Sequence, residues 1–189
     1  NEGHELTIVS PVERRRRVST NFLQKEGVSI LQVKTFNIQK TNLIEKGLGT
    51  LAIEYQYLSA IKKYTSDKKF DLVLYSTPPI TFAKVIEFVK KRDNAKTYLL
   101  LKDIFPQNAV DMKMLKKDGF IHQKFVKKEK KLYQISDTIG CMSPANVEFI
   151  LKHNPEINKN KVEVNPNTIE PIVFNYSEED KNTIRKKYL

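Results

Sequence analysis

The sequence predicts an α/β fold of the Rossmann-like kind, with a mostly parallel sheet and helices on both of its faces. Short apolar runs alternate along the chain with longer segments of helical periodicity, which is the pattern of parallel strands joined by helical crossovers. The runs 71–76 and 98–101 are largely apolar, as expected for strands buried on both faces. A chain of 189 residues is long enough for a substantial core.

Six strands are predicted from runs rich in β-branched, aromatic and leucine residues, bounded by polar or turn-forming residues. They cover Leu6–Ser10, Val28–Val33, Asp71–Ser76, Thr97–Leu101, Thr138–Cys141 and Val162–Val164.

Four helices are predicted between these strands. They cover about Asn42–Tyr64, Ile80–Lys91 after Pro78-Pro79, Gln123–Ser136 and Pro144–Lys152 with Ser143 as its cap. The apolar face of the first helix would hold Leu48, Leu51, Tyr55, Leu58 and Ile61, and that of the third would hold Phe125, Leu132 and Ile135.

The composition excludes several classes of protein. There is no run of about 18 apolar residues that could span a membrane. The single Cys141 excludes a disulfide framework and fits a core position in a reducing compartment. The three histidines are too far apart in sequence to pair as metal ligands, and we expect His122 at the surface. The net charge of +11 favours a polyanionic partner: nucleic acid, an anionic membrane or a phosphorylated substrate.

Ligands of parallel α/β sheets bind beyond the carboxyl ends of the strands. Asp103 follows an apolar strand there and could accept a proton or orient a hydroxyl, or it could simply cap a helix or pair with Lys102. Ser76 and Thr77 place two hydroxyls at the same edge, although a turn that only begins the next helix would look the same.

Two further patterns have competing interpretations. Gly47 and Gly49 match a loose dinucleotide pattern, but no strand directly precedes them, so the start of a helix is the better interpretation. Lysines interleave with apolar residues over 113–125, and Arg14–Arg17 form a second basic cluster. The lysine-rich stretch could be a solvated face, a surface that docks on anionic lipid or a surface that binds nucleic-acid phosphates. Its members are Lys113, Lys116, Lys117 and Lys124 with Leu115, Phe120, Ile121 and Phe125.

Six motifs, in order, resemble those of the amino-terminal half of bacterial family-4 glycosyltransferases of the GT-B fold, in the group that builds capsule and O-antigen polysaccharides. The motifs lie at 3–11, 71–79, 101–106, 133–139, 142–144 and 166–171. By this resemblance, 1–171 form a Rossmann-like acceptor-binding domain whose first strand is missing. Residues 172–189 form a linker and the start of a donor-binding domain, with a helix beginning at Ser177, so we expect a segment of a longer protein.

The resemblance also implies a function. Such enzymes move a sugar, with retention of configuration and without a metal or cofactor, from a nucleotide sugar to an acceptor that is often a lipid-linked sugar. The resemblance implies a peripheral, cytoplasmic location on the inner face of the plasma membrane, where Lys113, Lys116, Lys117 and Lys124 would meet anionic lipid. By position, Asp103 would orient the acceptor hydroxyl as the catalytic residue, and Ser76, Thr77, Phe105 and Asn167 would bind the acceptor.

Two other functions stay open at this point. The first is a basic α/β module that binds nucleic acid without catalysis, although we recognise no nucleic-acid motif and the aromatic residues are not spaced as a stacking platform. The second is a domain that binds a phosphorylated sugar without chemistry.

Overall fold

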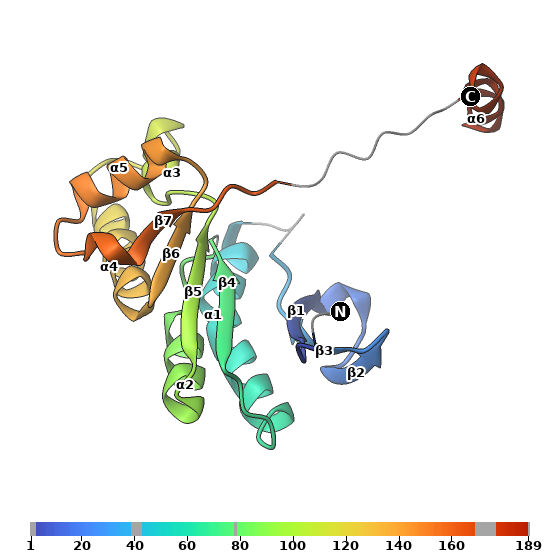
Figure 1. Ribbon diagram of the computed structural model, residues 1–189, viewed down its shortest axis with the longest axis horizontal. Coiled ribbons are helices and arrows are strands. Elements are labelled where there is room, and N and C mark those ends of the chain that lie inside the picture. Colours follow the sequence, from blue (N-terminus) through green and yellow to red (C-terminus); the bar gives the residue numbers. More distant parts are fainter. Residues whose placement is uncertain (1–2, 39–42, 78, 169–176, 189) are drawn as a thin grey trace.

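Strands and helices alternate along the chain in the computed structural model, as the sequence predicts (Figure 1). The structure describes residues 3–38, 43–77, 79–168 and 177–188. Within these ranges the strands form two sheets, one of four strands and one of three. The four-stranded sheet is parallel throughout and flanked by helices. These features confirm the α/β class and agree with a Rossmann-like fold.

The four-stranded sheet has the order β4-β5-β6-β7, so each strand lies beside the next one in sequence. Right-handed crossovers that always advance in one direction place their helices on one face of a sheet. The strands are Leu72–Ser76, Lys96–Leu101, Thr138–Cys141 and Val162–Val164. The crossovers are α2 (Ala83–Asp93), α3 (Gln107–Asp111) with α4 (Phe120–Ile135), and α5 (Pro144–His153) followed by the short η2 (Lys159–Lys161).

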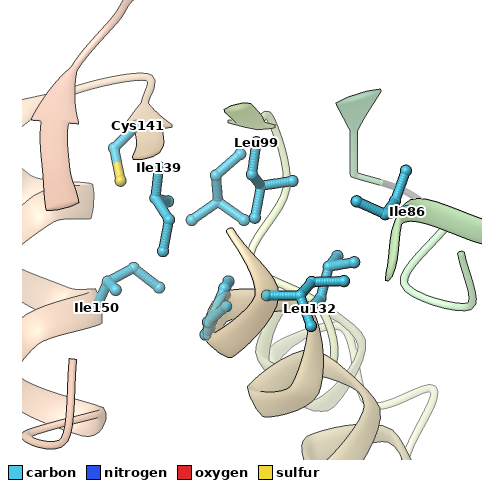
Figure 2. Close-up of a cluster of buried hydrophobic side chains, with 9 residues drawn as sticks. Ile86, Leu99, Leu132, Ile139, Cys141 and Ile150 are labelled. Carbon is cyan, nitrogen blue, oxygen red and sulfur yellow. The ribbon is translucent and has the colours of Figure 1, made fainter. Parts of the chain in front are cut away.

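The core of this sheet lies between β5, β6 and the crossover helices. Figure 2 shows Leu99 and Ile139 from the strands facing Ile86, Leu132 and Ile150 from the helices. Leu99, Ile139 and Cys141 are fully buried, because β5 and β6 turn alternate residues toward the helices. Ile150 of α5 is fully buried against them. The prediction that Cys141 is a core residue is therefore confirmed, and burial raises the pKa of its thiol to about 11, which does not suit a nucleophile.

The three-stranded sheet has the order β1-β3-β2. In it, β1 (Thr7–Glu13) runs parallel to β3 (Val28–Thr35), and β2 (Asn21–Lys25) runs antiparallel to β3. The two residues between β2 and β3, Glu26 and Gly27, have φ values of 51° and 79°, which is typical of a tight hairpin turn. Sequence analysis missed β2, since only two of its five residues are apolar. The arginines after β1 form the short η1 (Arg14–Arg16).

One layer of helices supports both sheets. Helix α1 (Leu43–Tyr64) packs against β3, and its Tyr57 ring lies 4.7 Å from the Phe82 ring beside α2. A second core cluster joins Leu31 of β3, Ile53 of α1 and residues of α2. Val73 and Phe82 pack against both clusters, so the two sheets share a continuous apolar base.

Gly49 explains how α1 comes so close to the segment that follows β3. It lies within α1, and a Cβ atom at this position would come 3.0 Å from the Asn37 carbonyl oxygen and 3.1 Å from the Ile38 side chain. Gly47 also lies within α1. The two glycines therefore belong to a packed helix and not to a nucleotide-binding loop, as the sequence interpretation preferred.

The structure corrects three predictions about burial. The run 71–76 is not buried on both faces, because Leu72 and Leu74 are 56% and 60% exposed. Tyr55 does not face the core of α1, where Ile53, Tyr57 and Ala60 lie instead, and it is 59% exposed. His122 is buried and not at the surface. Its Nδ1 accepts a hydrogen bond from the Asp118 main-chain N–H just before α4.

Two predicted helix starts follow their sequence signals, whereas α2 begins at Ala83 and not at Ile80, and α4 begins at Phe120 and not at Gln123. Ser143 Oγ accepts a hydrogen bond from the Asn146 N–H at the start of α5, as predicted. Helix α6 (Glu178–Tyr188) begins after Ser177, also as predicted. Pro78, the side chains of Leu48 and Leu51, and the domain boundary predicted at 171/172 lie outside the described residues.

Candidate functional site

The carboxyl ends of β4 and β5 meet at a junction formed by Thr77 and Asp103. The Thr77 N–H donates to the Leu100 carbonyl over 3.1 Å, which extends the pairing of β4 with β5 by one residue. The Thr77 hydroxyl donates to the Asp103 carbonyl over 3.1 Å and accepts from the Asp103 N–H over 3.4 Å. Thr77 is 2% exposed, whereas Asp103 is exposed. A buried hydroxyl therefore fixes the main chain of an exposed carboxylate.

The Asp103 carboxylate makes no hydrogen bond or ion pair with any other described residue, including Lys102. Neither does Asp103 cap α3, because the residue before that helix is Pro106, which offers no side-chain hydrogen bond. Within the described residues, Asp103 therefore neither caps a helix nor pairs with Lys102, which were its two possible structural roles. Its carboxylate can accept hydrogen bonds from a ligand.

The other residues predicted to bind the acceptor are dispersed around this junction. Ser76 lines a groove between β1 and β4. The Phe105 ring packs edge-on against Phe125 of α4, with centroids 5.0 Å apart and an angle of 74°. Asn167 is exposed beyond β7, and no hydrogen bond among the described residues joins it to Thr77 or Asp103. The structure therefore brings Thr77 and Asp103 into contact but not the full predicted set.

Sequence analysis missed a polar cluster in which side chains from β5 and from β7 and the residue after it meet across β6. The Tyr98 hydroxyl donates to Glu163 Oε1 over 2.6 Å and accepts from Asn165 Nδ2 over 2.7 Å. Burial, together with the bond to Glu163, raises the pKa of Tyr98. Gly140 makes room for this cluster, since a Cβ atom there would lie 2.4 Å from the Tyr98 hydroxyl and 2.9 Å from Asn165 Cβ. In the sequence, only Gly140 inside the short apolar run 138–141 indicated that another group comes close to this strand.

The predicted lysines lie on a surface that also carries apolar side chains. Lys113, Lys116, Lys117 and Lys124 are exposed, and Lys124 Nζ lies 4.3 Å from the centre of the Phe120 ring. Phe120 is 73% exposed and Met114 76%. We call the following eight residues the lysine-rich surface: Met112, Lys113, Met114, Lys116, Lys117, Phe120, Ile121 and Lys124. Leu115 and Phe125, by contrast, are half-buried, and the two methionines were not predicted.

Two further findings bear on the class of site. Among the described residues, no three His, Cys, Asp or Glu side chains come together where they could hold a metal ion. None of the helices in the described ranges is both long enough and apolar enough to cross a bilayer.

The fold and the site together define a Rossmann-like α/β domain with an exposed carboxylate at the carboxyl edge of its parallel sheet. No protein-family model matches the chain, and no curated protein matches it significantly in sequence.

Proposed function

We propose that this chain binds the sugar acceptor in a retaining glycosyltransferase that uses a nucleotide sugar. The observation that carries the proposal is the Thr77–Asp103 junction. At this junction the Thr77 hydroxyl fixes the main chain of Asp103. The Asp103 carboxylate is exposed and has no partner among the described residues. It lies at the strand edge where α/β sheets bind ligands. The six motifs that resemble family-4 glycosyltransferases include both residues of this junction.

In this proposal Asp103 accepts a hydrogen bond from the acceptor hydroxyl and orients it toward the anomeric carbon of the donor sugar. The Asp103 carboxylate can accept hydrogen bonds from a hydroxyl, and we assign it the role of orienting the acceptor. By the resemblance, the donor phosphate takes the acceptor proton and no metal is needed. Thr77 is a positioning residue, because its hydroxyl bonds the main chain of Asp103 and not the carboxylate. Ser76, Phe105 and Asn167 would complete the acceptor site.

The lysine-rich surface supports a membrane location for the proposed lipid-linked acceptor. Exposed Phe120, Ile121, Met112 and Met114 are apolar anchors placed among four lysines, and such a combination binds anionic bilayers through both buried apolar area and charge. A peripheral position on the inner face of the plasma membrane would bring a polyprenyl-diphosphate sugar within reach of Asp103. Binding of nucleic acid is the rival function, and it depends on charge but not on apolar anchors.

Co-sedimentation with anionic vesicles, with and without a polyprenyl-diphosphate sugar, tests the proposal directly. We expect binding that rises with the lipid-linked sugar and survives an excess of single-stranded or duplex DNA. Asp103→Asn should remove the increase caused by the sugar but keep the basal binding. Asp67→Asn, which changes an exposed aspartate before the amino end of β4, is the matched control and should behave as wild type.

A second pair of variants tests the lysine-rich surface. Lys116→Glu with Lys117→Glu should abolish basal vesicle binding, whereas Lys25→Glu with Lys69→Glu makes the same change of charge on exposed lysines near the amino ends of the strands and should weaken it little. Vesicle binding that DNA removes, with no response to the lipid-linked sugar, would favour the nucleic-acid module instead.

A further inference from the structure

An open cavity of about 440 Å³ lies between α1 and the segments at the end of β3 and before the start of β2. It shares no residue with the Thr77–Asp103 junction. The cavity, which we call the α1–β3 cavity, is lined by Thr20, Lys34, Tyr55, Gln56, Ser59, Ala60, Lys63 and Tyr64. This lining contains two lysines and several hydroxyl groups, and no described carboxylate belongs to it. The α1–β3 cavity is therefore suited to an anion that accepts hydrogen bonds.

Specific hydrogen bonds hold the walls of the α1–β3 cavity together. The Tyr64 hydroxyl donates to the Thr20 carbonyl over 3.1 Å, and the Lys34 N–H donates to the Thr20 hydroxyl over 3.0 Å. Gln56 also lines the cavity, and its Oε1 is buried without a hydrogen-bond partner among the described residues. Because an unpaired buried acceptor costs free energy, a ligand that brings a donor to this wall would be favoured.

A turn of four arginines adjoins the α1–β3 cavity. Arg14–Arg17 comprise η1 and the residue that caps it, and we call them the arginine turn. The chain enters the turn after Val12, which is the partner of Lys34 in the pairing of β1 with β3. It leaves the turn toward Thr20, which is bonded to Lys34 and precedes β2 on the opposite side of β3. The arginine turn therefore crosses the carboxyl end of β3, next to two residues of the cavity wall.

The main chain of the arginine turn is fixed, whereas most of its guanidinium groups are free. The Arg15 N–H donates to Asn37 Oδ1 over 3.1 Å. Glu13 pairs with Arg15 and accepts a hydrogen bond from the Ile38 N–H over 3.0 Å. The other three arginines are exposed, and their side chains make no hydrogen bond or ion pair with any other described residue. Since neighbouring positive charges repel each other, an anion shared by these arginines would stabilise the turn.

We propose that the arginine turn and the α1–β3 cavity form a binding site for the diphosphate group of a small molecule. Guanidinium groups bind phosphate oxygens through paired N–H donors, and ammonium groups bind them as point charges. The side chains that would bind the diphosphate, none of which forms an ion pair within the described chain, are Arg14, Arg16, Arg17, Lys34 and Lys63. The rest of the ligand would lie in the cavity beside Ser59 and Gln56.

The cavity favours a small molecule over a membrane or a nucleic acid. Its volume of about 440 Å³ falls within the range of small-molecule sites, roughly 300–1,000 Å³. A bilayer surface or a nucleic-acid backbone could meet the exposed arginines but would leave the cavity and the Gln56 acceptor unfilled. The diphosphate site goes beyond the proposed glycosyltransferase function and does not depend on it.

Inorganic pyrophosphate is the probe for this site. Calorimetric titration of the full chain at physiological salt should show saturable binding. Amide chemical shifts should change most at Arg14–Arg17, Thr20 and Lys34. Sulfate should bind at least about tenfold more weakly, because it lacks the second phosphate group. Asp103→Asn should bind pyrophosphate as wild type does, so a failure of the glycosyltransferase proposal and a failure of the diphosphate site can be told apart.

Variants of the arginine turn test its contribution. Arg14→Gln, Arg16→Gln and Arg17→Gln together should weaken pyrophosphate binding by about tenfold or more. Lysine at the same three positions keeps the charge but removes the paired donors, so it should restore only part of the affinity. The matched control changes three exposed lysines near the amino ends of the strands: Lys25→Gln, Lys69→Gln and Lys159→Gln. This control should bind pyrophosphate nearly as wild type does, and urea unfolding verifies the fold of every variant.

Two further variants test the cavity. Lys34→Gln with Lys63→Gln removes both cavity charges and should weaken pyrophosphate binding severalfold. Ser59→Trp adds a large ring at the cavity wall without a change of charge, and it should hinder access to the two lysines with a similar effect. Ser66→Trp, at an exposed serine that does not line the cavity, is the matched control and should have little effect.

Any of three results would overturn the proposal. The first is the absence of saturable pyrophosphate binding. The second is an equal loss of binding in the arginine variant and in its lysine control, because net charge alone would then attract the anion. The third is an arginine variant that binds pyrophosphate as wild type does but loses binding to anionic vesicles or to DNA. A membrane or a nucleic acid would then be the partner of the arginine turn.

Discussion

The buried Thr77 hydroxyl is bonded to both main-chain groups of the exposed Asp103, donating to its carbonyl over 3.1 Å and accepting from its N–H over 3.4 Å. The strand ends of β4 and β5 are therefore joined through one side chain. Whatever ligand Asp103 meets, the position of its carboxylate depends on Thr77.

We expect Thr77→Val to destabilise the chain by about 1–2 kcal/mol, because it preserves the shape of the side chain but leaves the Asp103 N–H without its partner. It should also weaken the response of vesicle binding to the lipid-linked sugar. Thr77→Ser keeps the hydroxyl and should retain most of both properties. Urea unfolding measures the first effect and co-sedimentation the second. If Val and Ser variants behave alike, the hydroxyl does not hold Asp103.

Asp103→Ala should abolish sugar transfer by the glycosyltransferase that we propose while leaving the fold intact. The Asp103 side chain contacts no other described residue through a hydrogen bond or ion pair, so its removal should change the free energy of unfolding by no more than about 0.5 kcal/mol. Transfer of labelled sugar from a nucleotide sugar and urea unfolding are the two measurements. Wild-type turnover in the variant would remove Asp103 from the mechanism.

Gly140→Ala should destabilise the chain by about 1–3 kcal/mol, because the new methyl group overpacks against the Tyr98 hydroxyl, only 2.4 Å away. Adding Tyr98→Phe removes that oxygen, so the double variant should recover part of the loss even though Tyr98→Phe alone breaks two hydrogen bonds. A double-mutant cycle by urea unfolding measures this coupling. Strictly additive effects would show that the methyl group is accommodated elsewhere.

Much of the fold could be predicted because local pattern and tertiary packing agree. The strands 138–141 and 162–164 have the predicted bounds, and Ser143 caps α5 as its sequence indicates. Burial on a given face was harder to predict. Leu72 and Leu74 form an apolar run, which is normally a sign of burial on both faces, yet they lie at a sheet edge where no neighbour among the described residues covers them.

The candidate site was predictable only in part. Asp103 and Thr77 follow two strands that pair with each other, so their proximity follows from the order of the strands. The Tyr98 cluster depends on side chains from β5 and β7 that meet across β6. Nothing local in the sequence links Tyr98 to Glu163, which is 65 residues away, and only the absence of a side chain at Gly140 allows the contact.

Asp93→Ala should lower the free energy of unfolding by about 3 kcal/mol, which is the lower end of the range for breaking a buried ion pair. Both Asp93 oxygens accept from Arg92, over 2.7 and 2.8 Å, and Oδ2 also accepts from the Phe70 N–H before β4. The bonds from Arg92 hold the pKa of Asp93 below its ordinary value, against the effect of burial. The stabilisation is therefore present above the ordinary pKa and is lost as the pH falls through the lowered one. Urea unfolding of wild type and variant should differ less in strong acid than at pH 7. A constant difference would contradict this assignment.

Glu129→Gln should make stability less dependent on pH between about pH 4 and pH 8. Glu129 of α4 is 9% exposed and accepts a hydrogen bond from the Tyr133 hydroxyl over 2.8 Å. Burial raises the pKa of Glu129 from 4.5 to about 7, although the bond from Tyr133 opposes this rise. In the unfolded chain the carboxyl ionises near its ordinary pKa. The folded state thus binds the proton more tightly, and stability falls as the pH rises from the ordinary pKa through the raised one.

The raised pKa of Glu129, from 4.5 to about 7, corresponds to an upper limit on the order of 3 kcal/mol at 1.36 kcal/mol per unit. Gln keeps an oxygen that can accept from Tyr133 but does not ionise. The variant should therefore gain stability relative to wild type as the pH rises, and its advantage should level off above pH 8. Urea unfolding across this pH range measures the gain, with Glu148→Gln on the exposed side of α5 as control. Parallel pH profiles for wild type and Glu129→Gln would show that folding does not raise the pKa of Glu129.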